Sequence, residues 1–348
     1  MTLPSRAKAL LSLALVALAA GTAACGGDDD SGETAAASAG GASAPDKIVI
    51  GYQAIPNGDL VVKHEGWLEA ALPDTEIEWK IFDSGGVLNE AIAAGSVDIG
   101  LAGSSPVARG LSTPLEYQVP WIHDVIGKAE ALVARDGITD LEGLRGKKIA
   151  TPLASTSHYS LLAALEDAGI AQGDVEIVDA EPPDIAAAWE RGDIDAAYVW
   201  NPVLAELVAD GGTTLVDSEQ LANEGKTTYD LGVVTNEFAD QYPDAVKTWV
   251  EQQDRAVKLY RDDPDAAAAA VAAELNLEPA AALAQMKDLI FLDASEQVAP
   301  DALGGGLGSA LAATAKFNQE LAQIPSTQDD QFYSEAVNPS FAESVAAR

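Results

Sequence analysis

Residues 187–202 read AAWERGDIDAAYVWNP, and residues 89–106, NEAIAAGSVDIGLAGSSP, repeat their pattern. In each stretch a helical run ends at a glycine, an aspartate opens a short apolar strand, and a proline follows. The glycines, Gly95 and Gly192, lie 97 residues apart, as do the two aspartates, and the prolines lie 96 apart. A glycine after a helix, a buried strand and a proline early in the next helix form one βα step. The repeat predicts two related α/β units, although two common α/β connections can also match by chance.

Strands are expected on both sides of this repeat, and they suggest how the chain is divided. The first unit has expected strands at 47–52, 76–82 and 97–101, and the second at 129–135, 148–151, 175–178 and 195–200. A strand at 229–235 returns to the first unit, and the remaining chain is helical, with expected helices at 265–275, 279–289 and 307–324. Earlier helices are expected at 60–72, 86–94, 157–168 and 185–191.

This order predicts an α/β fold with two lobes joined by a two-strand hinge. Each lobe is expected to be a doubly wound sheet with flanking helices. Lobe 1 comprises residues 47–128 plus 231–348, and lobe 2 comprises residues 129–230. Ligands of open α/β sheets bind at the carboxyl ends of the strands, where helix N-termini point. We therefore expect a binding cleft between the lobes.

The composition excludes several classes of partner. The chain of 348 residues carries 20 Lys plus Arg against 55 Asp plus Glu, a net charge of −35, and 48% of its residues are hydrophobic. It is thus a packed globular chain that lacks the clustered basic residues needed to bind nucleic acid or anionic lipid. Its only cysteine, Cys25, excludes an internal disulfide framework and any multi-cysteine metal site. We expect no cofactor and no metal.

The N-terminal segment is expected to contain a targeting signal followed by a flexible tether. Arg6 and Lys8 precede an apolar run, residues 9–20, that is too short to span a bilayer but typical of a signal peptide. The following Thr-Ala-Ala-Cys25 resembles the lipobox of bacterial lipoproteins, which implies cleavage of residues 1–24 and acylation of Cys25. Residues 25–46, rich in small and acidic residues, are expected to be a flexible tether. An ordinary signal peptide with an incidental cysteine is the alternative.

Two segments place hydroxyl groups where a strand leads into a helix. Ser104 and Ser105 follow the strand at 97–101, and Ser155-Thr156-Ser157-His158-Tyr159 follows the strand at 148–151. Hydroxyls together with the unpaired N–H groups at a helix start suit an anion. Neither segment contains Lys or Arg, so a sulfonate or carboxylate is favoured over a phosphate. Simple N-capping of the helices is the alternative.

The two crossing strands offer acidic groups for a cation. Glu130 and Asp230 lie at the points where the chain passes between the lobes, and their carboxylates suit a ligand ammonium group. Solvated acids on an acidic surface are the alternative. Trp200, at a strand end, and Gln53, after the first strand, are candidates for the walls of the cleft.

Five motifs carry a resemblance to a known family. FDSGG (82–86), GSSP (103–106), STSHYSLLAAL (155–165), AAWERGDIDAAYVWNP (187–202) and DSEQ (217–220) resemble the taurine-binding proteins of bacterial ABC importers. These belong to the sulfonate, nitrate and taurine group of type II periplasmic binding proteins. The resemblance implies that the sulfonate is held by Ser104, Ser105, Thr156, Ser157 and His158. It implies Glu130 and Asp230 for the ammonium, with Gln53, Tyr159 and Trp200 lining the cleft.

The sequence also departs from the family pattern. Ser157 stands where Thr is frequent, Gly232 follows Leu231 where Trp is frequent, and the loop after Gln53 is its own. These departures leave the sulfonate end unchanged and bear on which aminoalkyl tail fits. Without residues 1–24 the net charge becomes −37, because Arg6 and Lys8 are lost. A field of this sign favours a zwitterion over a free anion.

The resemblance implies an extracytoplasmic substrate-binding protein that captures taurine and delivers it to an ABC permease and, through it, to the ATPase. We expect a monomer at the outer face of the cytoplasmic membrane, with the lipid as its only membrane contact. A receptor for another aliphatic sulfonate, nitrate or small zwitterion is the alternative, as is a signalling receptor without a permease. An enzyme on the same fold is not expected, because the only cysteine is Cys25, and His64 and His123 have no second metal ligand nearby.

Overall fold

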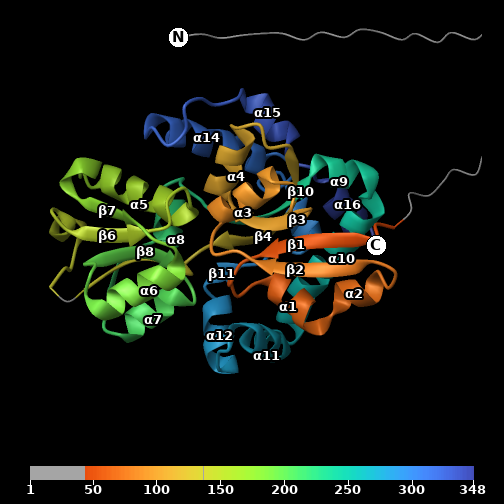
Figure 1. The fold of residues 1–348 in the computed structure, drawn as a ribbon, viewed down its shortest axis with the longest axis horizontal. Coiled ribbons are helices and arrows are strands. Elements are labelled where there is room, and N and C mark those ends of the chain that lie inside the picture. Colours follow the sequence, from red (N-terminus) through yellow and green to blue (C-terminus); the bar gives the residue numbers. More distant parts are fainter. Residues whose placement is uncertain (1–43, 136) are drawn as a thin grey trace, which may run out of the picture. The chain divides into compact units, whose positions relative to one another are not determined.

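The computed structural model describes residues 44–135 and 137–348. The predicted signal peptide, the acylation site Cys25 and all but the last three residues of the predicted tether lie outside the described residues. Within the described part, the strands form two sheets, one of six strands and one of five. Figure 1 shows the two sheets with their helices.

The six-stranded sheet has the order β11-β4-β10-β3-β1-β2. Its strands are β1 (Lys47–Tyr52), β2 (Glu76–Ile81), β3 (Ile99–Gly103), β4 (Tyr117–Ile126), β10 (Tyr229–Thr235) and β11 (Leu289–Ile290). β1 pairs in parallel with β2 and β3, whereas β10 is antiparallel to both β3 and β4.

The five-stranded sheet has the order β7-β6-β8-β5-β9. Its strands are β5 (Glu130–Ala134), β6 (Lys148–Thr151), β7 (Glu176–Asp179), β8 (Ala196–Trp200) and β9 (Thr213–Asp217). β6 pairs in parallel with β7 and β8, and β5 is antiparallel to both β8 and β9.

Both sheets follow one plan. The order β2-β1-β3-β10-β4 in one corresponds to β7-β6-β8-β5-β9 in the other: three parallel strands, one antiparallel strand and a fifth strand beside it. In each sheet the antiparallel strand, β10 or β5, is the one that the chain enters after crossing over. The two-lobed α/β fold predicted from the repeat is thus confirmed. The residue boundaries of the lobes stay a prediction; β10 begins at Tyr229, two residues before the expected boundary.

Sixteen α-helices occur in the described residues. They are α1 (Gly58–Glu65), α2 (Trp67–Ala71), α3 (Gly85–Ala93), α4 (Ser104–Leu111), α5 (Thr156–Asp167), α6 (Pro182–Arg191), α7 (Val203–Ala209), α8 (Ser218–Asn223), α9 (Asn236–Gln241), α10 (Pro243–Asp262), α11 (Pro264–Leu275), α12 (Pro279–Met286), α13 (Ala294–Gln297), α14 (Gly306–Glu320), α15 (Asp330–Glu335) and α16 (Ser340–Ala346).

The five-stranded sheet is buried on both faces because its strands are apolar at successive positions. Leu132 and Tyr198 face a core formed with α5 and α8, whereas Val133 and Val199 face a second core formed with α6 and α7. Side chains alternate between the faces of a strand, so a continuous apolar run supplies both cores. The helices lie on opposite sides of this sheet in Figure 1.

Several elements differ from the sequence prediction, each for a local reason. The helix expected at 60–72 is broken into α1 and α2 at Gly66, whose backbone is left-handed with φ of 63°. The strand expected at 97–101 lies at 99–103, so Ser104 and Ser105 form the first turn of α4. β4 was not predicted; Pro120 interrupts its apolar pattern, and proline is unusual in a strand interior.

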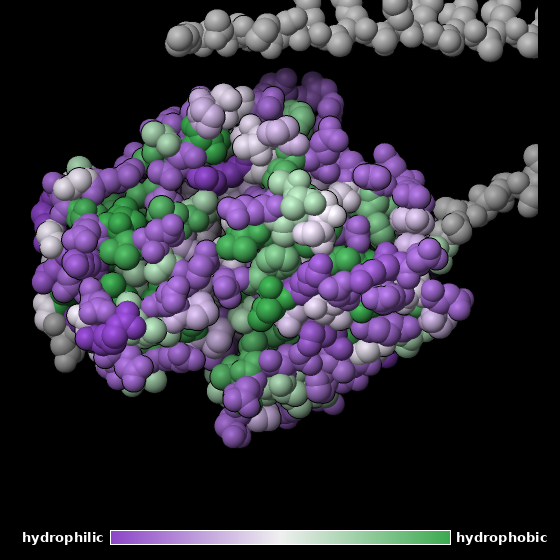
Figure 2. Space-filling model, viewed as in Figure 1, coloured by the Kyte–Doolittle hydropathy of each residue, from purple (hydrophilic) through white to green (hydrophobic). Residues whose placement is uncertain are grey.

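The surface agrees with the acidic composition. Most of the face seen in Figure 2 is hydrophilic, and the large hydrophobic side chains that are exposed belong to different elements, such as Ile81 on β2 and Val208 on α7. Among residues 44–135 and 137–348, no helix is both long enough and apolar enough to cross a membrane.

Gly232 shows how the fold accommodates a departure from the family pattern. It lies in the middle of β10, and a β-carbon there would overlap the Cη2 atom of Trp249 and lie 3.4 Å from Nε2 of His123. Trp249 extends from α10, is fully buried, and meets the His123 ring edge-on at a centroid distance of 5.7 Å. An indole from α10 therefore occupies the space that a side chain at position 232 would need.

We expect Gly232→Ala to lower the free energy of unfolding by about 1–3 kcal/mol, because the added methyl group overpacks a closed core. Gly173→Ala is the matched control, since a β-carbon there meets no atom within 4 Å. Urea unfolding of both variants measures the difference. Equal stability of the two variants would show that α10 can move away from the sheet at no cost.

Candidate functional site

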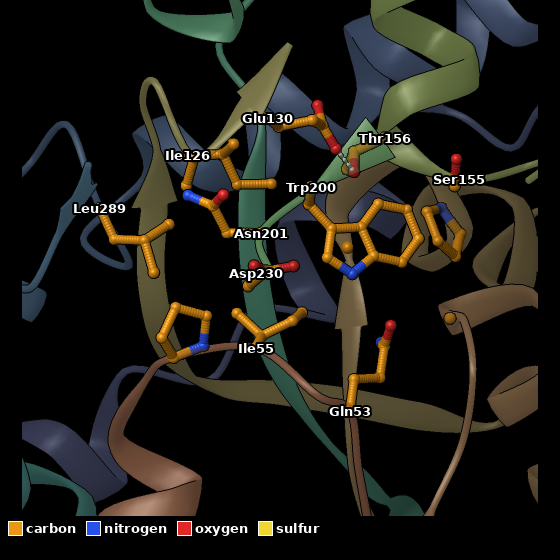
Figure 3. A pocket seen from close by; sticks show the side chains of 15 residues that line it. Gln53, Ile55, Ile126, Glu130, Ser155, Thr156, Trp200, Asn201, Asp230 and Leu289 are labelled. Atoms are coloured by element: carbon orange, nitrogen blue, oxygen red, sulfur yellow. Dashed lines mark hydrogen bonds between the residues drawn. The ribbon is translucent and has the colours of Figure 1, made fainter. Parts of the chain in front are cut away.

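A small pocket is lined by residues from both sheets. Figure 3 shows these side chains. Five of the ten residues predicted to bind ligand lie in this lining: Gln53, Glu130, Thr156, Trp200 and Asp230. The structure thus brings together residues spread over more than 170 positions of sequence. Their roles in binding stay predictions.

The two acidic residues occupy equivalent places in the two sheets. Glu130 opens β5 and pairs with Trp200 at the end of β8, and Asp230, the second residue of β10, pairs with Gly103 at the end of β3. Each acid therefore stands where the chain has just crossed between the lobes, opposite the carboxyl end of a parallel strand. The internal repeat explains why both reach the same pocket.

Glu130 is fully buried and accepts four hydrogen bonds from hydroxyl groups. Thr156 Oγ1 and Ser157 Oγ donate to its Oε2 at 2.5 and 2.9 Å, and two more donors reach its Oε1: Ser218 Oγ at 2.8 Å and Ser160 Oγ at 3.3 Å. Burial raises the pKa of Glu130, and the four donors act in the opposite direction.

This network bears on the predicted sulfonate site. A hydroxyl group has one proton to donate, and those of Thr156 and Ser157 are directed to Glu130. The dashed line in Figure 3 marks the first of these bonds. The two hydroxyls are therefore not free to donate to an anion in this arrangement, contrary to the expected geometry.

Three helices begin at the pocket. Gly85 is the first residue of α3, Gly103 caps α4, and Ser155 caps α5, and all three line the pocket. Ser155 Oγ accepts the N–H of His158 at 3.1 Å, as expected of an N-cap. The first N–H groups of a helix have no acceptor within the helix and form its positive end. The pocket therefore has an electropositive side without any Lys or Arg in its lining.

The other five predicted residues lie behind the lining. Ser104 Oγ accepts the N–H of Tyr229 at 3.2 Å, and Ser105 Oγ accepts from the side chain of Asn318 at 3.3 Å. Ser157 contacts Glu130, as described above. These residues support the pocket through buried contacts.

His158 and Tyr159 complete this group. Nδ1 of His158 accepts the N–H of Ala154 at 3.2 Å, and burial, with a smaller effect of Arg109, lowers the pKa of His158 to about 4. A neutral His158 does not supply a positive charge to an anion. The Tyr159 ring packs edge-on against Phe317 of α14 at a centroid distance of 4.9 Å.

Several lining residues were not predicted from the sequence, although some of them lie in motifs that pointed to the site. Gly85, Gly103, Pro106 and Asn201 lie inside the quoted motifs but were not selected. The others lie in strands or loops that carried no motif: Ile55, Pro56, Ile126, Ala129 and Leu289. Ser155, inside the STSHYSLLAAL motif, lines the pocket as the N-cap of α5.

The two lobes also touch at the edge of the pocket. Ser84 Oγ, at the N-cap of α3, donates to Oε1 of Glu181, which is the N-cap residue of α6, at 3.1 Å. A β-carbon on Gly103 would lie only 2.6 Å from Cγ2 of Thr156. The pocket is thus bounded by direct contacts between elements of the two lobes.

The arrangement suits a small ligand with separated charges. Buried carboxyl groups and helix N-termini both line the pocket, with the apolar surfaces of Trp200, Ile126 and Leu289 beside them (Figure 3). In the described residues no group of three potential metal-binding side chains occurs.

The chain is similar to known proteins. Residues 41–276 match the NMT1-like family. The taurine-binding periplasmic protein of Escherichia coli K12 is 39% identical over 276 residues, which cover 77% of this chain and 84% of that protein.

Two solved structures share the fold at lower identity. The alkanesulfonate-binding protein SsuA of Xanthomonas axonopodis pv. citri, bound to MOPS, has a TM-score of 0.72 and 23% identity, and the match covers 85% of this chain and 99% of that one. The desulfurization enzyme DszB has a TM-score of 0.62 and 20% identity, covering 87% and 99%. Both show the fold alone. The family match over most of the described residues is decisive, and the chain belongs to the NMT1-like family.

Proposed function

We propose that the protein is an extracytoplasmic substrate-binding protein that captures taurine, 2-aminoethanesulfonate, and delivers it to an ABC permease. The lining of the pocket supports this proposal most directly. Buried carboxyl groups and three helix N-termini surround one small space, and no Lys or Arg lines it. Taurine has an ammonium group and a sulfonate group separated by two methylene groups. The likeness to the taurine-binding periplasmic protein of E. coli supports the same ligand.

Asp230 and Glu130 bind the ammonium group in this proposal. Asp230 lines the pocket and is 6% exposed, so its carboxyl group is reachable from the cleft and nearly dehydrated. Hydrogen bonds to charged groups contribute about 1.5–3 kcal/mol each. Glu130 is held in place by its four hydroxyl donors and adds negative charge beside Asp230.

The sulfonate lies at the helix N-termini. Its oxygens accept from the first backbone N–H groups of α3, α4 and α5, near Gly85, Ser104 and Thr156. This replaces the hydroxyl donors expected from sequence, because those of Thr156 and Ser157 serve Glu130. Each helix terminus contributes up to about 2 kcal/mol when partly buried.

The proposal also covers where the protein is located, its oligomeric state and whether it is catalytic. We propose that acylated Cys25 holds a monomeric protein at the outer face of the cytoplasmic membrane. We propose binding without catalysis, a proposal supported by the likeness to a periplasmic binding protein at 39% identity.

Isothermal titration calorimetry tests the ligand. We expect one taurine bound per chain, and weaker binding of ethanesulfonate, nitrate and β-alanine, because each lacks one of the two charged groups or presents a different anion. If ethanesulfonate binds and taurine does not, the assignment of the ammonium site is wrong.

Asp230→Asn tests the ammonium contact. We expect a loss of about 10- to 100-fold in taurine affinity, equivalent to one charge-assisted hydrogen bond, and little change for ethanesulfonate. Asp98→Asn is the matched control: Asp98 is a half-buried acid that accepts the N–H of Val49 at 2.7 Å and precedes β3, at the far end from Gly103. Equal losses for taurine and ethanesulfonate in Asp230→Asn would remove Asp230 from the ammonium site.

A further inference from the structure

A second buried acid stands directly behind Asp230. Asp124 lies on β4 opposite Asp230 on β10 and is fully buried. Its Oδ2 accepts from Nδ2 of Asn57 at 3.4 Å, and its Oδ1 has no hydrogen-bond partner among the described residues. β4 was not predicted from the sequence, so Asp124 was not among the candidate residues.

Asp124 and Asp230 are directly paired positions of the antiparallel strands β4 and β10, so their side chains lie on the same face of the sheet and close together. Both side chains are buried, and two neighbouring buried carboxyl groups cannot both ionise without strong repulsion, which favours a proton on one of them. Burial raises the pKa of Asp124 to about 7, and burial followed by the charge of Asp124 raises the pKa of Asp230 well above its usual range. The pair therefore shares one proton near neutral pH, and its apparent proton affinity belongs to both groups.

Lobe 2 contains the matching position with a different residue. Ser218 directly follows β9, which pairs with β5 as β4 pairs with β10, and its hydroxyl donates to Glu130 at 2.8 Å. Ser218 thus stands to Glu130 as Asp124 stands to Asp230. A serine always has a proton to donate, whereas an aspartate has one only when protonated. The internal repeat therefore allows the two acids to be compared. Glu130 has a neighbour, Ser218, that can always donate a proton, whereas Asp230 has a neighbour, Asp124, that can donate only while it is protonated.

We propose that Asp124 is a positioning residue that makes ligand binding release a proton. In the empty pocket Asp124 and Asp230 share a proton, and the cationic group of the ligand displaces it to solvent. At the two carboxyl groups one positive charge enters and one leaves, whereas the sulfonate of the ligand binds elsewhere in the pocket. This inference rests on the proposed function, because it requires a ligand with a cationic group.

The surrounding ionisable groups act in the same direction. Glu130 from β5 and Asp59 from α1 both raise the pKa of Asp124 through their negative charge. His123 on β4 lies with its Nε2 3.6 Å from Oδ2 of Asp59, and burial lowers its pKa. α10 contributes the amide of Gln253, which donates to Asp59 at 2.6 Å, and β3 has no ionisable side chain. Removal of the Asp124 charge therefore lowers the proton affinity of Asp230.

Calorimetry in two buffers of different ionisation enthalpy counts the protons released on binding. At pH 6 we expect about one proton per taurine for the unmodified protein, and roughly tenfold tighter binding at pH 7.5, because the competing proton is then mostly absent. For Asp124→Asn we expect release near zero and an affinity that changes little between these pH values. Asp124→Ser, which copies the arrangement at Ser218, is expected to behave in the same way while retaining a donor to Asp230. Asp98→Asn is expected to release protons like the unmodified protein.

The outcomes separate this inference from the proposed function. If the unmodified protein binds taurine without proton release, the inference is overturned and the function stands; this measurement needs no variant to fold. If Asp124→Asn and Asp124→Ser both keep the full release, Asp124 is not the group involved. If the unmodified protein does not bind taurine at either pH, the proposed function fails, and this inference fails with it.

The same pair predicts how stability depends on pH. An acid whose pKa is higher in the folded state binds more protons folded than unfolded between the two pKa values, so stability falls as pH rises through that window. We expect the melting temperature of the ligand-free protein to fall between about pH 4 and pH 7, the range bounded by the usual aspartate pKa and that of Asp124. The fall should be smaller in Asp124→Asn, and smaller with saturating taurine. An identical slope in the variant would contradict the shared proton.

Discussion

The buried carboxylate of Glu130 is the interaction on which the pocket depends. An unpaired ion in this position would cost several kcal/mol. Four hydroxyl groups offset that cost, and they come from the first turn of α5, from its second turn and from the start of α8. The same bonds thus join β5, α5 and α8 into one unit at the point where the chain crosses between lobes. The N-terminus of α5 is aimed at the cleft because its hydroxyls are anchored there.

The hydrogen bonds to Glu130 also determine which polar groups of the pocket remain available to a ligand. In the proposed binding mode, the hydroxyls that satisfy Glu130 do not serve an anion as well, and the anion binds to backbone N–H groups, whose positions are set by the helices. The acids at the crossing strands bind the cation in the same proposal. A pocket built in this way favours a ligand with no net charge over a free anion, in keeping with the acidic excess of the whole chain.

The sequence predicted the plan of the molecule better than its contacts. The repeat around Gly95 and Gly192 predicted two related lobes, and both glycines have the positive φ angles, 67° and 75°, that a helix end of this kind requires. Glu130 and Asp230 were found because they lie on strands with clear patterns. Asp124 was missed because Pro120 obscures its strand, and Leu289 because β11 is only two residues long. The direction of the Thr156 and Ser157 hydroxyls depends on Glu130, 26 and 27 positions away, which no local pattern reveals.

The order of strands along the chain has a consequence for assembly. All five strands of the second sheet come from one continuous stretch, residues 130–217, whereas the first sheet lacks its β10 until after that stretch. Pairing Gly103 with Asp230 closes a loop of more than 120 residues that contains the entire second sheet. As the chain is synthesised from its N-terminus, all strands of the second sheet are available before β10 has been made. The first sheet can be completed only afterwards. Lobe 1 is therefore the first to be synthesised in part and the last to be completed. The pocket forms only then, because Asp230 of β10 and Leu289 of β11 belong to its lining.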